Sequence, residues 1–345
     1  MTEQRLSRRT LMAAAGGVAA LGVTPSAGAN ANDAASTTGR SLADAVIAAF
    51  RRHRVVAIGE IHGQQAHHDA LQTLLLDPRL PGVVNDIVVE FGNALYQPTM
   101  DRFVAGPAVE DRDLRPVWRN TTQSPVVTLD APMYEQFYRT VRAANWPLPE
   151  AKKMRVLLGD PPVDWDRVTS RDDVESLDRD GHLVSAVTHE VLAKGRRALI
   201  CYGTNHVMHG PEGAQGGSGV ARIEQQTGER VYVIVAGGHP RLASQPRRVV
   251  IPAKGSWLES ADTSEFTYFP GMPGVPFGWV ADALLYLGPV SEQTVSLWNP
   301  AIYLDPVYWA ELQRRKALMD SPVDLEQQYR REQSVRWPHP TTPPP

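Results

Sequence analysis

Short, uninterrupted runs of apolar residues recur along the chain, and segments with helical periodicity separate them. The helical segments carry apolar residues three and four positions apart, as in Leu71, Leu74 and Leu75. Apolar strands that alternate with such helices are what a mostly parallel sheet covered on both faces requires. The pattern therefore predicts an α/β fold with helices on both faces of the sheet. The predicted strands are 55–59, 86–92, 154–160, 197–203 and 230–238, and the predicted helices are 41–54, 64–77, 94–106, 131–146, 180–195 and 219–228.

The pattern changes after residue 240, where proline, glycine and aromatic residues become frequent. Helical periodicity is weak there until a last predicted helix at 305–320. We expect residues 41–240 to form the α/β core domain and residues 241–335 to form an irregular C-terminal extension that covers the core. A small second domain is the alternative interpretation. The proline-rich end, 336–345, is predicted to be a flexible tail.

The N-terminal residues 1–29 have the pattern of an export signal. Paired Arg8 and Arg9 precede a short Ala/Gly-rich apolar run and small-residue cleavage sites, which resembles a twin-arginine-type signal. The run is short for a membrane-spanning helix, which needs ~20 residues, so cleavage is favoured over an N-terminal anchor. Residues 30–40 are small and polar and predict a disordered leader. We therefore expect a periplasmic or secreted bacterial protein with no stable membrane anchor after cleavage.

Composition limits the classes of partner and of site. Of the 345 residues, 42 % are hydrophobic, enough for a large core. The formal net charge of −3 provides no basic field to hold nucleic acid, so we expect a small-molecule or peptide substrate. The only cysteine, Cys201, excludes a disulfide within one chain and a thiolate metal cage. Its place in an apolar run predicts a buried, inert thiol, and the oligomeric state stays open.

Ionisable residues stand where the predicted strands end. Glu60 and His62 follow the first strand, Glu90 the second, Asp160 the third and His206 the fourth. The ligand crevice of an open α/β sheet lies beyond the carboxyl ends of its strands. Because carboxylates and imidazoles are costly to bury unless they are paired or used in chemistry, we expect these five side chains to meet around one site.

Two of these strand ends share the form G-x-x-H, as "GEIH" and "GTNH". Gly59 and Gly203 are expected to let the backbone turn sharply there. Within "NHVMHG", His206 holds the strand-end position and is preferred over His209. The pair His67–His68 lies at the start of the next predicted helix, where we expect one ring to face solvent.

Together these motifs resemble a superfamily that groups erythromycin esterases, ChaN-type haem-binding lipoproteins and Tiki/TraB proteins. The resemblance covers residues 45–240 and includes the G-E-x-H motif, the His67–His68 pair, the segment 88–106, the pair Arg179–Asp180 before a helix and the last G-x-x-H. G-E-x-H and the following histidine pair are most similar to the ChaN branch.

The branches imply different functions. The esterase branch implies hydrolysis without metal, with a histidine as general base on water, although this chain has one residue between Glu60 and His62 where the esterases have two. The Tiki branch implies metal-dependent peptide hydrolysis, with His62, Glu90 and His206 as ligands. The ChaN branch implies haem binding, although the lipid-attachment cysteine is absent here.

We therefore expect an exported hydrolase that attacks an ester or amide bond with activated water. A divalent metal, zinc or manganese, would lower the pKa of bound water to ~7; without metal, a histidine base contributes ~10²–10⁴-fold. Both mechanisms need the same residues, and the alternative is a ChaN-like haem- or metal-binding protein without turnover. We expect His67, Asp160 and Arg179 to contact the substrate. The expected catalytic residues are Glu60, His62, Glu90 and His206.

Overall fold

The structure is a computed structural model, in which the predicted export signal and most of the predicted leader and tail lie outside the described residues. No helix in the described part of the chain is both long enough and apolar enough to cross a membrane. The described residues are 39–125, 129–210, 217–269, 271–298 and 301–336.

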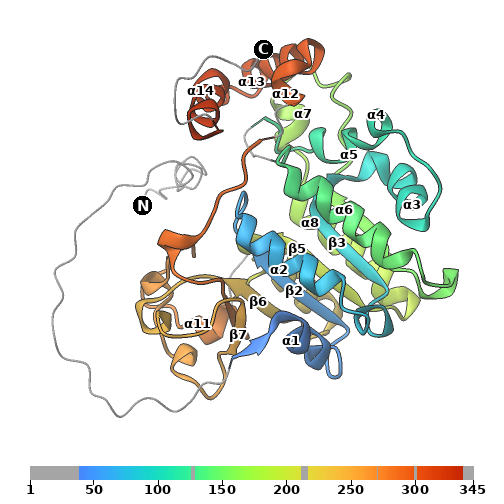
Figure 1. The fold of residues 1–345 in the computed structure, drawn as a ribbon. Helices are drawn as coiled ribbons and strands as arrows, with labels where there is room; N and C mark the ends of the chain where they lie inside the picture. Colours follow the sequence, from blue (N-terminus) through green and yellow to red (C-terminus); the bar gives the residue numbers. More distant parts are fainter. Residues whose placement is uncertain (1–38, 126–128, 211–216, 270, 299–300, 337–345) are drawn as a thin grey trace, which may run out of the picture. The chain divides into compact units, whose positions relative to one another are not determined.

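One eight-stranded sheet runs through the described chain (Figure 1). Its strands are β1 (Arg40–Ser41), β2 (Val55–Glu60), β3 (Asp86–Asn93), β4 (Arg155–Asp160), β5 (Ala198–Gly203), β6 (Tyr232–Ala236), β7 (Val249–Pro252) and β8 (Ala283–Tyr286). Their order in the sheet is β1-β7-β8-β6-β2-β5-β3-β4. The strands from β8 to β4 in this order run parallel, whereas β7 pairs antiparallel with both β8 and β1. The predicted mostly parallel α/β fold is confirmed.

The five predicted strands correspond to β2 through β6, and the sheet continues beyond them. Residues after 240 had been expected to cover the core as an extension. They also add β8 beside β6, and β7 beside β8. The sheet therefore does not end at residue 240. Both added strands are only four residues long and lie between stretches rich in proline and glycine, so their apolar runs give little periodic signal.

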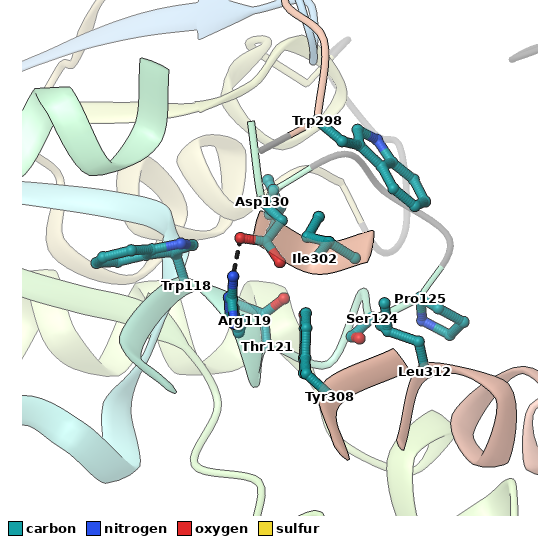
Figure 2. Close-up of a pocket in the computed structure, with 11 residues that line it drawn as sticks. Trp118, Arg119, Thr121, Ser124, Pro125, Asp130, Trp298, Ile302, Tyr308 and Leu312 are labelled. Atoms are coloured by element: carbon teal, nitrogen blue, oxygen red, sulfur yellow. Dashed lines mark hydrogen bonds and ion pairs between the residues drawn. The ribbon is translucent and has the colours of Figure 1, made fainter. Parts of the chain in front are cut away.

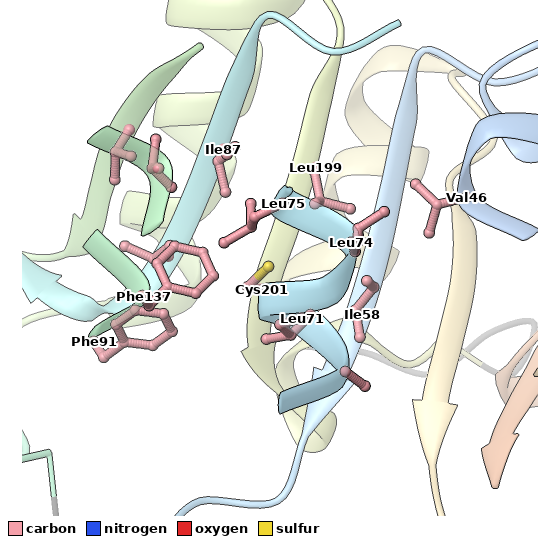
Figure 3. Close-up of a cluster of buried hydrophobic side chains, with 14 of the residues drawn as sticks. Val46, Ile58, Leu71, Leu74, Leu75, Ile87, Phe91, Phe137, Leu199 and Cys201 are labelled. Atoms are coloured by element: carbon pink, nitrogen blue, oxygen red, sulfur yellow. The ribbon is translucent and has the colours of Figure 1, made fainter. Parts of the chain in front are cut away.

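Helices cover both faces of the sheet because successive side chains of each strand point to opposite faces. On one face, Leu71, Leu74 and Leu75 of α2 lie over Ile58 of β2 and Cys201 of β5, as Figure 3 shows. Fully burying each of these leucines contributes ~1.5–3 kcal/mol. The helices of this face are α1 (Leu42–Ala49), α2 (Gln65–Leu75), α3 (Gln97–Ala105) and α6 (Pro132–Asn145); those of the other are α8 (Arg179–Ser185) and α10 (Gly219–Thr227).

The predicted helix at 180–195 is not uniform. It begins as α8, continues as a π-helical segment at Ala186–Val191 and closes with a 3₁₀ turn at Leu192–Lys194. Gly195 follows with φ +68°, the left-handed conformation that glycine adopts readily. The remaining helices are α4 (Asp111–Leu114), α5 (Pro116–Arg119), α7 (Asp172–Glu175), α9 (Thr204–Val207), α11 (Phe277–Val280), α12 (Ala301–Leu304), α13 (Pro306–Leu318) and α14 (Leu325–Arg336).

Helix α13 packs on the segment that follows α5. A small cavity lies between them, with the buried ion pair Arg119–Asp130 (3.0 Å) on its wall, as Figure 2 shows. Its volume of about 20 Å³ accommodates about one water molecule. This cavity is therefore a packing gap between elements and not a ligand site.

Candidate functional site

The carboxyl ends of four parallel strands bring the predicted site residues to one rim of the sheet, which we call the strand-end rim. Glu60 is the last residue of β2, Asp160 is the last residue of β4, and Glu90 lies near the end of β3. His62 follows β2, and His206 lies on α9, directly after β5. In β3 the pairing register with β4 shifts between Val89 and Asn93, which is the kind of irregularity that re-aims a side chain.

Glu90 is the centre of the strand-end rim. His62 Nε2 lies 3.7 Å from its Oε2, and His206 Nε2 lies 3.5 Å from its Oε1. The two histidines of the G-x-x-H motifs, 144 positions apart in the chain, therefore face the same carboxylate. The predicted convergence of these three side chains is present in the structure.

The remaining hydrogen-bonding capacity of Glu90 is also occupied. Arg179 and the Gly203 backbone N–H donate to it, and the Gln123 side chain donates at 3.0 Å. Burial opposes ionisation of Glu90, but the charges of Arg179, His206 and His62 outweigh it and hold its pKa below the usual value. A carboxylate that is ionised and saturated with donors is a poor base. Glu90 therefore orients the groups around it.

Glu60 fixes the orientation of His62. Its carboxylate accepts a hydrogen bond from His62 Nδ1 (2.5 Å), from the Tyr134 hydroxyl (3.1 Å) and from His68 Nε2 (3.1 Å). Burial opposes ionisation of Glu60, yet the hydrogen bonds from His62 and His68 hold its pKa well below the usual value. Burial likewise disfavours the charged form of His62, but the Glu90 and Glu60 carboxylates outweigh it and raise the pKa of His62 to about 9. His62 is therefore protonated at neutral pH.

Asp180 fixes the orientation of His206 in the same way. His206 Nδ1 lies 2.8 Å from Asp180 Oδ1, which also accepts from the Gly219 backbone N–H at 2.9 Å. The ring is thereby held with Nε2 toward the strand-end rim. Asp180 was not among the predicted site residues. Its position directly after Arg179, at the start of a predicted helix, was the signal that could have identified it.

Arg179 links the two most buried acids of this side of the rim. It contacts Glu90, and its Nε lies 3.7 Å from Asp160 Oδ1. Asp160 also accepts from the backbone N–H (2.7 Å) and the hydroxyl (2.5 Å) of Thr122. Burial raises the pKa of Asp160 to about 7. Asp160 is buried, and through these contacts it holds Arg179 and the segment around Thr122 in place.

Thr122 and Gln123 were missed by the sequence analysis. Both lie in the segment between α5 and α6, which has no helical or strand periodicity and follows no predicted strand. No sequence signal marked them. They reach the strand-end rim because the segment folds back over the ends of β3 and β4, where they donate to Glu90 and Asp160.

The histidine pair of α2 does not behave as predicted. We expected one ring to face solvent, but His67 and His68 are both fully buried, so that expectation is wrong. The physical reason is aromatic packing: the ring of His68 lies against Phe91 and Tyr134, and the ring of His67 lies against that of His68. Burial lowers the pKa of His67 to about 3. His67, predicted to contact substrate, is thereby removed from the surface that a substrate can reach.

The other histidine of "NHVMHG" is structural. His209 is buried, and its Nδ1 and Nε2 lie 3.0 Å from Glu224 and 2.9 Å from Asp282. Both ring nitrogens are thus engaged away from Glu90. The geometry agrees with the preference for His206 at the rim.

The two motif glycines provide space beside the rim. Gly59 lies inside β2, so the expectation of a sharp turn is wrong there, whereas Gly203 is the last residue of β5 and α9 begins directly after it. A Cβ on Gly203 would lie 3.0 Å from Glu90 Oε2 and 3.2 Å from His62 Nε2. Gly203 therefore allows its own strand to approach the carboxylate and imidazole closely.

The arrangement does not fit a divalent metal ion. Within the described residues, no group of three or more His, Cys, Asp or Glu side chains is placed to hold one. The proposed ligands His62, Glu90 and His206 do approach one another, but the guanidinium of Arg179 already lies on the Glu90 carboxylate. A cation at that position repels a second one.

The same residues do not fit haem ligation. A haem iron on Nε2 of His62 or His206 would lie beside the Arg179 guanidinium, whose positive charge opposes it. His67 and His68, which the ChaN resemblance brought in, are fully buried. We therefore derive no step that passes through haem or metal.

No protein-family model matches the sequence, and no curated protein matches it. Three solved structures are similar to the chain in fold. The type III effector HopBA1 is 13 % identical with a TM-score of 0.40, over 74 % of this chain and 99 % of its own. A Bacillus cereus protein is 10 % identical with a TM-score of 0.41, over 68 % and 88 %. ChaN of Campylobacter jejuni, which binds cofacial haem, is 11 % identical with a TM-score of 0.34, over 56 % and 85 %. Such distant likenesses do not establish a shared activity.

Proposed function

We propose that this chain is a hydrolase that cleaves an ester or amide bond with a water molecule activated by a histidine, without a metal ion. One observation carries the proposal. Each of the two imidazoles has its Nδ1 held by a carboxylate, Glu60 or Asp180, while both Nε2 atoms face Glu90 at the partly exposed strand-end rim. A pair of oriented imidazoles is the arrangement that acid and base catalysis needs.

Each imidazole lies between Glu90 and a second carboxylate, but that second carboxylate is fully buried beside His62 (Glu60) and 27 % exposed beside His206 (Asp180). In its neutral form, His206 donates Nδ1–H to Asp180, which leaves the Nε2 lone pair to accept a proton from water. His62 lies between two carboxylates, which raise its pKa to about 9, so its Nε2 carries a proton to donate. We assign His206 as the general base and His62 as the general acid.

The attack of water on a carbonyl carbon places negative charge on the carbonyl oxygen. Arg179 and protonated His62 are the positively charged groups of the rim and stabilise that charge. When the bond to the leaving group breaks, His62 Nε2 donates its proton to the leaving atom. Glu60, Glu90 and Asp180 hold these groups in orientation throughout.

Substrate turnover tests the proposal. Purified protein treated with a chelator is assayed against a panel of carboxylic esters, phosphate esters and peptides, beside His62→Gln and His206→Gln. We expect turnover by the wild type in the presence of chelator and a loss of about 10²-fold or more in each variant, as for removal of an acid or base. His189→Gln, at an exposed position of the π-helical segment, is the matched control and should retain full activity. Turnover that survives His206→Gln, or that the chelator abolishes, would contradict the proposal.

A further inference from the structure

The charged groups of the strand-end rim are arranged in two layers. The acids Glu60, Glu90 and Asp160 are at most 2 % exposed. The nitrogen-bearing side chains above them reach solvent, with side-chain exposures of 28 % for Arg179, 28 % for His62 and 21 % for His206. A ligand that approaches from solvent therefore meets N–H donors and positive charge first.

Asp180 is also partly exposed, but its negative charge lies away from the centre of the rim. Its Oδ1 accepts from His206 Nδ1 and from the Gly219 backbone N–H. Because Nδ1 and Nε2 lie on opposite sides of an imidazole ring, this carboxylate is on the far side of His206 from the centre of the rim. The partly exposed groups at the centre of the rim are therefore the two imidazoles and the guanidinium.

We infer that the bond cleaved at this site is a phosphate ester, with the phosphoryl group seated among Arg179, His62 and His206. This inference rests on the proposed hydrolase and names its class of substrate. A phosphoryl group carries permanent negative charge and several peripheral oxygens, which match a guanidinium and the protonated His62 imidazole converging from different elements, while His206 Nε2 faces the attacking water. A carboxylic ester or a peptide is neutral at the reacting group and offers one carbonyl oxygen, so it would leave donors of this set unmatched.

The residues that bind the phosphoryl group also supply the chemistry. A water oxygen forms a bond to phosphorus while its proton passes to His206 Nε2. The bond from phosphorus to the leaving oxygen breaks, and that oxygen takes the proton of His62 Nε2. The products are an alcohol and phosphate from a monoester, or an alcohol and a monoester from a diester. His206 then releases its proton to solvent, and His62 takes one up.

Two measurements test the inference. The first compares kcat/KM for p-nitrophenyl phosphate, bis-p-nitrophenyl phosphate and p-nitrophenyl butyrate. The second titrates inorganic phosphate into the protein by calorimetry. We expect a phosphate ester to be the better substrate by about tenfold or more, and phosphate to bind the wild type. In Arg179→Gln, turnover of the phosphate ester should fall by about 10²-fold, as when a transition-state donor is removed, and phosphate binding should weaken by about tenfold or more.

Two further variants separate binding from folding. Arg179 contacts buried acids, so Arg179→Lys, which keeps the charge, is measured beside Arg179→Gln and should recover part of the phosphate affinity. Arg167→Gln removes an arginine that pairs with Asp164 and whose side chain is 86 % exposed, and should change neither measurement.

The outcomes distinguish this inference from the proposed function. If the butyrate ester is turned over while both phosphate esters are not and phosphate does not bind, the inference is overturned and the hydrolase stands. If no ester or peptide is turned over, the proposed function fails. The phosphate titration then tests whether the rim binds an anion. Binding that Arg179→Gln abolishes then supports the site, and absence of binding overturns it.

Discussion

At the scale of single residues, the strand-end rim is organised by carboxylates that each hold an imidazole by Nδ1. Glu60 does so for His62, and Asp180 does so for His206. Glu90 faces both rings, so the two imidazoles differ in the carboxylate at Nδ1, which is fully buried for His62 and 27 % exposed for His206. Burial alone would keep His62 neutral, but Glu90 and Glu60 together reverse that preference. His62 therefore holds its proton at neutral pH.

The titration of His62 is the first prediction at this scale. Its pKa should be about 9 in the folded protein, compared with the ordinary value of ~6.5. An NMR titration of histidine ring resonances, assigned through His62→Gln, measures the midpoint. In Glu90→Gln the largest favourable charge is absent, so the midpoint should move toward neutral pH. A wild-type midpoint near the ordinary value would contradict the account of the rim.

The same shift has a consequence for stability. A histidine whose pKa is higher in the folded state binds its proton more tightly there. The contribution of His62 to the free energy of unfolding is therefore complete below pH ~6.5 and is lost as the pH rises toward 9. Denaturant unfolding of the wild type and of His62→Gln across this range should show the two curves converging at alkaline pH. A difference that does not change with pH would argue against a raised pKa.

At the scale of elements, α13 holds the segment 119–124, which reaches the strand-end rim. Buried Arg315 donates to Arg119 O (2.9 Å), to Asn120 Oδ1 (2.8 Å) and to Ser124 Oγ (3.2 Å). Residues 119–124 include the donors to Glu90 and Asp160. The Arg315 guanidinium also lies 4.6 Å from the ring centre of Trp165, whose indole N–H donates to Thr121 O. Helix α13, far along the chain, thus positions the segment that donates hydrogen bonds to Glu90 and Asp160.

Arg315→Met tests this arrangement. The variant keeps much of the apolar stem but leaves buried carbonyl and side-chain acceptors without their donor, so the free energy of unfolding should fall by ~1–3 kcal/mol. Turnover measured well below the unfolding midpoint should also fall, because the partners of Glu90 and Asp160 lose their support. Arg330→Met on α14, where the side chain is 79 % exposed, is the control. Reduced stability with unchanged turnover would show that α13 is only a structural cover.

His209 links α10 to the strands β6 and β8 through two acidic side chains. It bridges Glu224 of α10 and Asp282, which also accepts from the backbone N–H of Val233 in β6. Burial disfavours its charged form, but the hydrogen bonds from His209 to Asp282 and Glu224 outweigh this and raise its pKa. His209→Ala should therefore lower the free energy of unfolding by about 2–3 kcal/mol, as for hydrogen bonds to charged groups.

The pH dependence of the His209→Ala effect has a defined sign. Because the folded pKa of His209 is raised, its contribution is complete below pH ~6.5 and is lost as the pH rises through the folded value. His189→Ala, at an exposed position, is the control. Chemical denaturation at acid and alkaline pH measures both variants, and an effect that grows with pH would contradict the assignment.

At the scale of the whole molecule, the sequence predicted the elements with the strongest patterns. β2 through β6 were found because a strand buried on both faces is a continuous apolar run. β7 and β8 were missed because a four-residue run between proline and glycine carries no period. The burial of the histidine pair was also missed, since Tyr134 on α6, which packs on His68, lies far along the chain. Such contacts are set by tertiary packing and leave no local trace.

The candidate site was predictable to the extent that topology determines it. Glu60, His62, Glu90 and His206 were expected to meet because parallel strands end at one rim, and the structure places them together. What the residue types could not indicate is which acid holds each imidazole by Nδ1, or that Arg179 rests on Glu90. The position of Arg179 supports the proposal of metal-free chemistry, and both facts require coordinates.

The dependence of kcat/KM on pH, measured on both sides of pH 9 with the substrate that the panel identifies, tests the central claim most directly. The account assigns a protonated His62 as general acid, with a pKa of about 9. It predicts that kcat/KM falls as the pH rises through that value, because the acid has lost its proton. A kcat/KM that stays constant or keeps rising through pH 9 would contradict the assignment of the two imidazoles as an acid and base pair.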